Sequence, residues 1–241
     1  MRTAVLVFAL VALGLAGCKS DGKEEGPKTA LTTGTDPVVT GSIRPTAPKP
    51  VAEDGGGGDE EVKGWARERG IAVPASDRLP YCHGFGCEFK TAVPFGSADM
   101  AMLAGLFERH RTSPIQERVA IGLAQRWFEK KADSVIGAKP DKRGSELGDA
   151  HKQGQTDCID EATNTTTLLS WLERTGMMRW HRTRRPESRG AFLYAHATAV
   201  MTDKTTGIDW VADSWMRDSG DPIDIMPLEK WFSLAYVDPT E

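Results

Sequence analysis

The chain lacks an apolar run long enough to cross a bilayer. The longest run, Ala4–Leu15, falls well short of the roughly 20 residues that a transmembrane helix needs. An excess of one charge is also lacking, because 30 Lys and Arg residues stand against 34 Asp and Glu residues. This balance argues against nucleic acid as a general partner. There is no internal repeat, so a repeat architecture is not expected.

The first residues nevertheless have the order of a secretory signal. Arg2 supplies a positive charge, the short apolar run follows, and small residues lead into Cys18. The stretch Leu15-Ala16-Gly17-Cys18 resembles the lipobox of bacterial lipoproteins, whose cysteine is acylated and becomes the mature N-terminus. The resemblance implies a signal peptide over residues 1–17 and a lipid on Cys18. An ordinary cleaved signal with an incidental cysteine is the alternative.

The residue after the cysteine bears on location. Lys19 stands there rather than Asp, and by resemblance to Gram-negative sorting patterns this favours the outer membrane over the inner one. We therefore expect a protein of the cell envelope that is anchored to the membrane by its lipid and faces the periplasm.

Residues 18–62 have the composition of a tether. They are rich in Lys, Glu, Asp, Gly, Pro, Thr and Ser, and they show no apolar periodicity. Such a segment cannot bury enough apolar surface to offset its ordering entropy, so disorder is expected. Its root-mean-square reach is roughly 35 Å.

Residues 63–241 have the size of one domain and contain all seven Trp residues of the chain. Helical patterns come first and strand-like segments later, which predicts an α+β fold with a helical N-terminal part packed on an antiparallel sheet. Helices are expected over Glu60–Arg69, from Ser97, from Ser113 and over Cys158–Thr175. Strands are expected over Met177–Thr183, Ala191–Thr202 and Ile208–Trp215. The helix from Ser113 has the strongest start, a capping serine followed by proline and then glutamine.

The four cysteines can be assigned to different roles. Cys82 and Cys87 lie close together in a Gly-rich stretch, and an exported protein favours their oxidation to a disulfide. Zinc is the competing interpretation because His83 lies between them, but no fourth ligand stands at a usual spacing. With Cys18 acylated, Cys158 is left over, either as a buried inert thiol or as a reactive one.

Cys158 lies where a polar loop meets a predicted helix, and the helix N-terminus there favours a thiolate. Catalysis by a thiolate also needs a group that moves a proton, and His196 in the next strand but one is the candidate. Asp213 lies on the following strand. If the hairpin turn is centred on Lys204-Thr205, His196 and Asp213 are directly opposite, and any even-numbered loop keeps them on one face. The carboxylate would then fix the imidazole tautomer.

The chain resembles the transglutaminase-like branch of the papain-type cysteine enzymes in the order of three residues. These are a cysteine at a helix start, a histidine on a strand and an aspartate on the next strand. The likeness covers about Gln153 to Trp215 and is closest to the bacterial transglutaminase-like cysteine proteinases. It implies a papain/transglutaminase-like core with Cys158 as nucleophile, His196 as general base and Asp213 as orienting acid. An oxyanion donor is expected from the backbone N–H of Cys158 and from Gln155, or Gln153, unless these are solvated loop residues.

The calcium-dependent members of that family have an Asp-Cys-x-Asp pattern, which Asp157-Cys158-Ile159-Asp160 matches. The match implies that Asp157 and Asp160 bind calcium, since calcium takes carboxylate oxygens. The alternative is that both acids complement the helix N-terminus. No other cofactor is expected.

The expected function is acyl transfer on a lipid tether, most of all hydrolysis of peptide or amide bonds in an envelope protein. A peptidoglycan peptide amidase and a protein-crosslinking transglutaminase are enzymatic alternatives. The third is a non-catalytic envelope lipoprotein that uses the fold as a scaffold.

Overall fold

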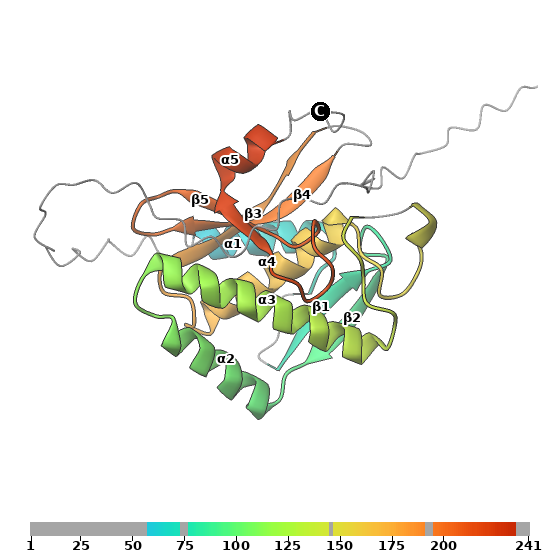
Figure 1. Ribbon diagram of the computed structural model, residues 1–241, viewed down its shortest axis with the longest axis horizontal. Coiled ribbons are helices and arrows are strands. Elements are labelled where there is room, and N and C mark those ends of the chain that lie inside the picture. Colours follow the sequence, from blue (N-terminus) through green and yellow to red (C-terminus); the bar gives the residue numbers. More distant parts are fainter. Residues whose placement is uncertain (1–56, 73–76, 145–146, 191–194, 235–241) are drawn as a thin grey trace, which may run out of the picture.

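The computed structural model describes residues 57–72, 77–144, 147–190 and 195–234 (Figure 1). Its helices are α1 (Gly57–Glu68), α2 (Ser97–Arg109), α3 (Pro114–Ile136), α4 (Cys158–Arg174) and α5 (Leu228–Ser233), with a short 3-10 turn at Leu147–Asp149. Its strands are β1 (Arg78–His83), β2 (Phe89–Pro94), β3 (His181–Arg189), β4 (His196–Asp203), β5 (Asp209–Asp213) and β6 (Asp224–Pro227). The predicted α+β class is confirmed.

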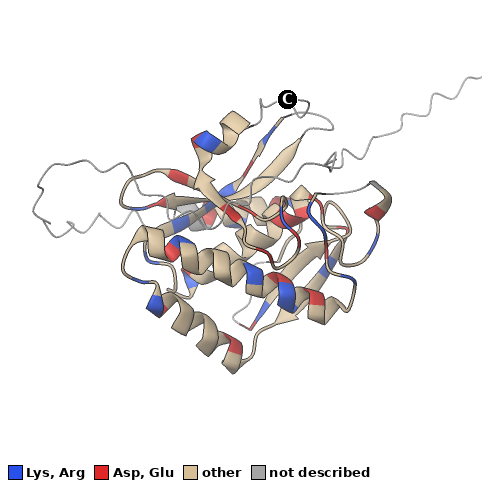
Figure 2. Cartoon of the chain, in the orientation of Figure 1, with Lys and Arg blue, Asp and Glu red and all other residues tan. Residues whose placement is uncertain are grey.

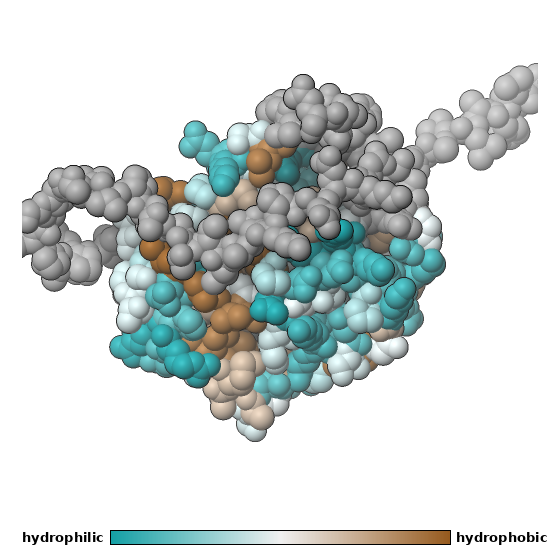
Figure 3. All heavy atoms as spheres, in the orientation of Figure 1, coloured by the Kyte–Doolittle hydropathy of each residue, from teal (hydrophilic) through white to brown (hydrophobic). Residues whose placement is uncertain are grey.

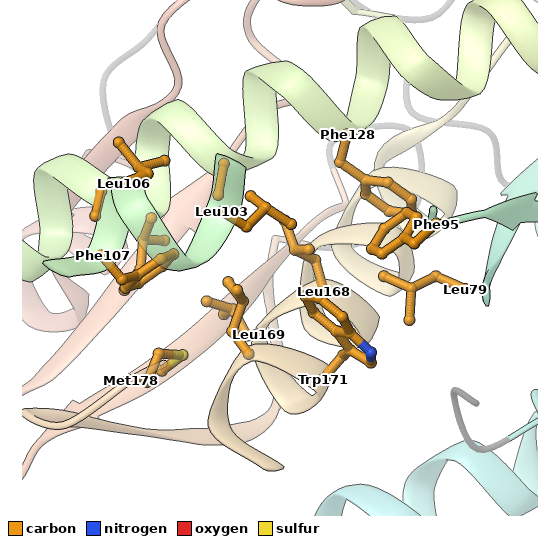
Figure 4. Close-up of a cluster of buried hydrophobic side chains, with 14 of the residues drawn as sticks. Leu79, Phe95, Leu103, Leu106, Phe107, Phe128, Leu168, Leu169, Trp171 and Met178 are labelled. Carbon is orange, nitrogen blue, oxygen red and sulfur yellow. The ribbon is translucent and has the colours of Figure 1, made fainter. Parts of the chain in front are cut away.

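Two antiparallel sheets flank one central helix. β1 and β2 form a two-stranded hairpin, and the other sheet has the order β3-β4-β5-β6. Helix α4 contacts the larger sheet on one side and β1 on the other, while α2 and α3 lie across it (Figure 1). Side chains from the hairpin and from these three helices meet in one apolar core (Figure 4). The best-buried large members are Leu79, Phe128, Leu103, Ile121, Leu168, Leu169, Trp171 and Leu172.

Helix α3 begins as its sequence predicts. Ser113 caps it, because its hydroxyl accepts the N–H of Gln116 at 3.2 Å, and Pro114 is the first helical residue. Gly137 ends it in the left-handed conformation at φ 69°. The buried carboxylate of Glu117 on this helix accepts the backbone N–H groups of Arg179, Trp180 and His181, at the start of β3.

Helix α4 forms in spite of its threonines. The segment Thr163–Thr167 has poor intrinsic helix propensity, yet every residue in it is buried. Packing on three sides therefore decides its conformation. The predicted end is confirmed, since Gly176 follows the helix at φ 74°.

The hairpin of β4 and β5 differs in detail from the prediction. Its turn is centred one residue later, on Thr205-Thr206, because Asp203 N donates to Ile208 O and Ala199 pairs with Ala212. The predicted direct opposition of His196 and Asp213 is therefore wrong. The loop is still even-numbered, so both side chains lie on one face, as expected.

Two element boundaries depart from expectation, and some elements were not predicted. β3 begins at His181 rather than at Met177, since Met177 N still donates to Leu172 O at the end of α4. The β1–β2 hairpin, β6 and α5 were not predicted. Helix α1 begins at Gly57, so the end of the segment expected as a disordered tether is helical, and the rest of that segment and the signal lie outside the described residues.

Along the ribbon in Figure 2, positions of Lys and Arg are interspersed among those of Asp and Glu. An apolar band crosses α3 and α2 on the face in Figure 3, and Met102, Ile115 and Leu123 of these helices are exposed. Among the helices that the structure describes, none is long and apolar enough to span a membrane.

Candidate active site

The side chains of His196 and Asp213 form a buried hydrogen-bonded pair, termed the His–Asp pair. His196 opens β4 and Asp213 closes β5. Nε2 of His196 lies 2.6 Å from Oδ2 of Asp213, and the side chains are only 6% and 4% exposed. The expected contact is confirmed, although it runs diagonally across the hairpin.

The second ring nitrogen of His196 is open. Its Nδ1 is buried and has no hydrogen-bond partner in the described part of the chain. An ionised carboxylate can only accept a hydrogen bond, so we assign the ring proton to Nε2, which faces Asp213. Nδ1 then carries a lone pair. The His–Asp pair therefore presents a nitrogen that can take a proton.

Two indoles enclose the imidazole. The rings of Trp215 and Trp231 lie with their centroids 4.6 and 5.5 Å from that of His196. Trp231, from α5, also donates its Nε1 proton to Oδ2 of Asp213 at 2.8 Å. Neither tryptophan was predicted as a site residue, because a single indole belongs to no motif.

Cys158 is the first residue of α4, after the capping residue Asp157. Its Sγ lies 3.9 Å from the carbonyl oxygen of Ala195, the residue directly before His196. Its side chain also packs against Trp215, which stacks on His196. Cysteine, indole and imidazole thus lie together at one end of the β4–β5 hairpin.

Cys158 is 2% exposed, and its sulfur is disulfide-bonded in this structure. A nucleophilic thiolate at this position therefore requires the reduced form of Cys158.

The predicted disulfide between Cys82 and Cys87 is present, with an S–S distance of 2.09 Å. It closes a segment, termed the disulfide loop (Cys82–Cys87), in which four successive residues have positive φ: Gly84 at 87°, Phe85 at 74°, Gly86 at 61° and Cys87 at 62°. A left-handed conformation costs non-glycine residues roughly 1–2 kcal/mol each. Successive N–H groups in such a loop point to one side and form an anion-binding concavity.

The carboxylates that enter this concavity are Asp157 and Asp160. Phe85 N and Cys87 N donate to Asp160 at 2.8 and 2.5 Å, and Gly86 N donates to Asp157 at 3.1 Å. Asp157 also accepts the N–H groups of Ile159 and Asp160, while the carboxylate of Asp160 accepts the N–H of Asp157. All four carboxylate oxygens therefore accept backbone protons, which favours capping of α4 over calcium ligation for both residues.

Burial and repulsion from Asp157 raise the pKa of Asp160 to about 8, against the opposing effect of the backbone donors. The His/Cys/Asp/Glu group in the described residues that is close enough for one metal ion is Cys82, Cys87 and Asp160. Two of its three members are consumed by the disulfide, so this group does not fit a metal.

Gln155 lies elsewhere than expected. Its side-chain amide donates to the carbonyl oxygen of Lys139 at 3.1 Å, and its own carbonyl accepts Gly84 N of the disulfide loop. Gln153 is exposed. Both contacts of Gln155 connect loops, so the side chain has a structural role in this conformation.

A set of buried acids lies behind the site. Burial raises the pKa values of Glu129, Asp133, Asp141 and Glu161, that of Asp141 to about 8. Glu161, on α4, accepts the hydroxyl of Ser214, which directly follows Asp213. Asp141 accepts the N–H of Thr156 at 3.1 Å. These acids tie the loops around Cys158 to the end of β5.

Comparison with known proteins found no matching family model, no matching curated protein and no matching solved structure.

Proposed function

We propose that the chain is a lipid-anchored envelope enzyme that transfers acyl groups through a thiol, with hydrolysis of peptide or amide bonds in an envelope protein as its reaction. Reduced Cys158 attacks the carbonyl, and His196 takes the thiol proton and returns it to the leaving amine. Asp213 holds His196 in the tautomer that the reaction needs. Water then releases the acyl group.

The observation that carries the proposal is the open Nδ1 of His196. Asp213 fixes Nε2 of His196, and Nδ1 is buried without a partner among the described residues. The residue directly before this histidine, Ala195, has the carbonyl oxygen that lies near Sγ of Cys158. A buried nitrogen without a partner costs about 1–3 kcal/mol, and a catalytic role explains why such a cost is retained.

The chain order and the elements agree with the papain/transglutaminase-like core that belongs to this proposal. Cys158 opens a helix, His196 opens a strand, and Asp213 closes the next strand. Helix α4 packs on β4, so the helix start and the hairpin end are neighbours.

Acylation of Cys18 is part of the same proposal. The chain has four cysteines, of which Cys82 and Cys87 pair with each other. The proposed reaction uses the reduced form of Cys158. Calcium is not required in this mechanism, because the oxygens of Asp157 and Asp160 already accept backbone protons.

A specific observation favours a second candidate, a non-catalytic envelope lipoprotein. Cys158 is 2% exposed, and a substrate carbonyl cannot reach its sulfur until the cover over it moves. In this candidate the cysteine, histidine and aspartate only stabilise the fold.

Alkylation separates the two candidates. The full-length lipidated protein is treated with iodoacetamide at pH 6, and the rate at Cys158 is followed by mass spectrometry without reductant. The enzyme should be labelled faster than a small free thiol, and His196→Gln should abolish the advantage. His151→Gln is the matched control, since that imidazole is 63% exposed.

Turnover is measured in parallel on a fluorescent protein substrate, on peptidoglycan peptides and with an amine acceptor. Hydrolysis of the protein substrate that is lost in Cys158→Ala, with an unchanged thermal melt, is the expected result. Peptidoglycan cleavage or amine incorporation would reassign the substrate or the acceptor. Slow labelling in every variant, together with no turnover, would refute the enzyme and favour the non-catalytic lipoprotein.

A further inference from the structure

Trp231 makes two kinds of contact with the His–Asp pair. Its Nε1 donates to Oδ2 of Asp213, the same oxygen that faces Nε2 of His196. Its ring also lies against the imidazole, with a centroid separation of 5.5 Å and an interplanar angle of 45°. Trp231 is 1% exposed, so α5 buries one indole over the pair.

Arg189 also contacts this indole. It is the last residue of β3 and pairs with His196 in the β3–β4 register. Its guanidinium carbon lies 4.2 Å from the centroid of the Trp231 ring, and its Nη1 donates to the carbonyl oxygen of Trp231. A cation over an indole face is attracted by the ring, and more strongly when it is desolvated. The indole therefore contacts both the guanidinium of Arg189 and the imidazole of His196.

We propose that Trp231 is a positioning residue for the catalytic histidine: its N–H fixes the carboxylate of Asp213, and its ring, seated by Arg189, keeps water from the bond between Asp213 and His196. This inference rests on the proposed function. A carboxylate that receives two donors on one oxygen keeps one orientation, and that orientation holds the imidazole with Nδ1 open.

Other charges also act on Asp213, and of these only the charge of Arg189 is changed in the test, in Arg189→Met. Glu161 reaches it from α4, and Arg217 from the segment after β5, where Arg217 is itself paired with Asp224 at 2.7 Å. The indole N–H of Trp231 goes to Asp213 itself, so replacing the indole leaves the ion pair of Arg217 and the hydroxyl bond of Glu161 in place.

The test is Trp231→Phe in the full-length chain in detergent, because phenylalanine keeps an aromatic ring and removes the N–H. The first readout is the proton NMR resonance of His196 Nε2–H, which is visible only while exchange with water is slow. We expect it in the parent protein and expect it to be lost in Trp231→Phe. The matched control is Trp180→Phe, which removes an indole bond to Arg111 O at the opposite end of β3 and should leave the resonance unchanged.

The second readout is the rate of hydrolysis. Loss of a hydrogen bond to a charged group should lower kcat about tenfold or more with little change in KM. Arg189→Met tests the contact that holds the Trp231 ring in place, and it also serves if Trp231→Phe does not fold. Its control is Arg185→Met, at an exposed position. Faster exchange of the His196 Nε2 proton with water is expected in Arg189→Met alone.

The inference is overturned if the resonance persists with full intensity in both Trp231→Phe and Arg189→Met, if it is absent from the parent, or if Trp180→Phe loses it equally. Absence of turnover in the parent protein would instead refute the proposed function, and the NMR result would still decide the role of Trp231.

Discussion

The hydroxyl of Thr156 lies 2.6 Å from Oδ2 of Asp141. The same hydroxyl lies 2.8 Å from Oε1 of Glu161, although it has one proton to donate. One of the two carboxyls must therefore supply a proton itself. Burial raises the pKa of both carboxyls, that of Asp141 to about 8, and the variant of Asp141 below tests its share.

Stability should consequently fall as the pH rises. The folded state keeps the proton on Asp141 up to about pH 8, whereas the unfolded chain loses it near the ordinary pKa of 3.8. Between these values the folded state binds more protons, so the free energy of unfolding decreases with pH, by up to about 1.4 kcal/mol per unit for this group. Urea unfolding from pH 5 to 8.5 measures the slope. Asp141→Asn should flatten it and be the more stable protein at pH 8, and a parallel slope in the variant would contradict the assignment.

Asp213→Asn should lower kcat/KM by about two to four orders of magnitude. An asparagine amide can donate to Nε2 of His196, which moves the ring proton to Nδ1 and removes the acceptor that the thiol needs. Steady-state hydrolysis measures the effect. Asp209→Asn, at the other end of β5, should stay within about threefold, since a change at a partly exposed ion pair is worth less than about 1 kcal/mol. Equal losses in the two variants would show that β5 is merely perturbed.

Trp215→Ala should lower the free energy of unfolding by about 3–5 kcal/mol, because the side chain is buried between Cys158 and His196 and its removal leaves a cavity. Its neighbour Met216 is 47% exposed, so Met216→Ala should change stability by less than about 0.5 kcal/mol. Denaturant titration distinguishes the two. A loss below about 1 kcal/mol for Trp215→Ala would mean that the indole does not fill this space.

Replacing both Cys82 and Cys87 by serine should cost about 2 kcal/mol in the chain-entropy model for so short a loop. It should also release the N–H groups of Phe85 and Gly86 from the carboxylates of α4. Hydrogen exchange at these two amides, compared with Thr91 in the neighbouring strand β2, measures the release. Unchanged protection of both amides would show that the carboxylates alone hold the loop.

Local patterns in the sequence were sufficient for much of the fold. The start of α3 follows from Ser113 and Pro114, and the disulfide follows from the spacing of Cys82 and Cys87. The contact of His196 with Asp213 follows from strand alternation, which depends only on whether the loop is odd or even.

Features that depend on distant partners could not be predicted in this way. Three of the six backbone donors to Asp157 and Asp160 lie more than 70 residues earlier in the chain, so the sequence around the cysteine left both calcium binding and capping open. Trp231 acquires its role only because α5 folds back over β5. The register of the hairpin was misplaced because the turn Lys204–Gly207 has no residue pair that fixes its centre.

The carboxylate of Glu117 has a consequence for how the chain can be divided. Because one side chain of α3 accepts three successive amides, the last of which belongs to the first residue of β3, a helix that precedes α4 secures the first strand of the larger sheet. A fragment that starts after Ile136 would leave those amides without their acceptor, at about 1–3 kcal/mol apiece. The parts of this domain before and after Ile136 are thus not separable modules. An expression fragment limited to α4 and the β4–β5 hairpin should be recovered only as insoluble or unfolded material.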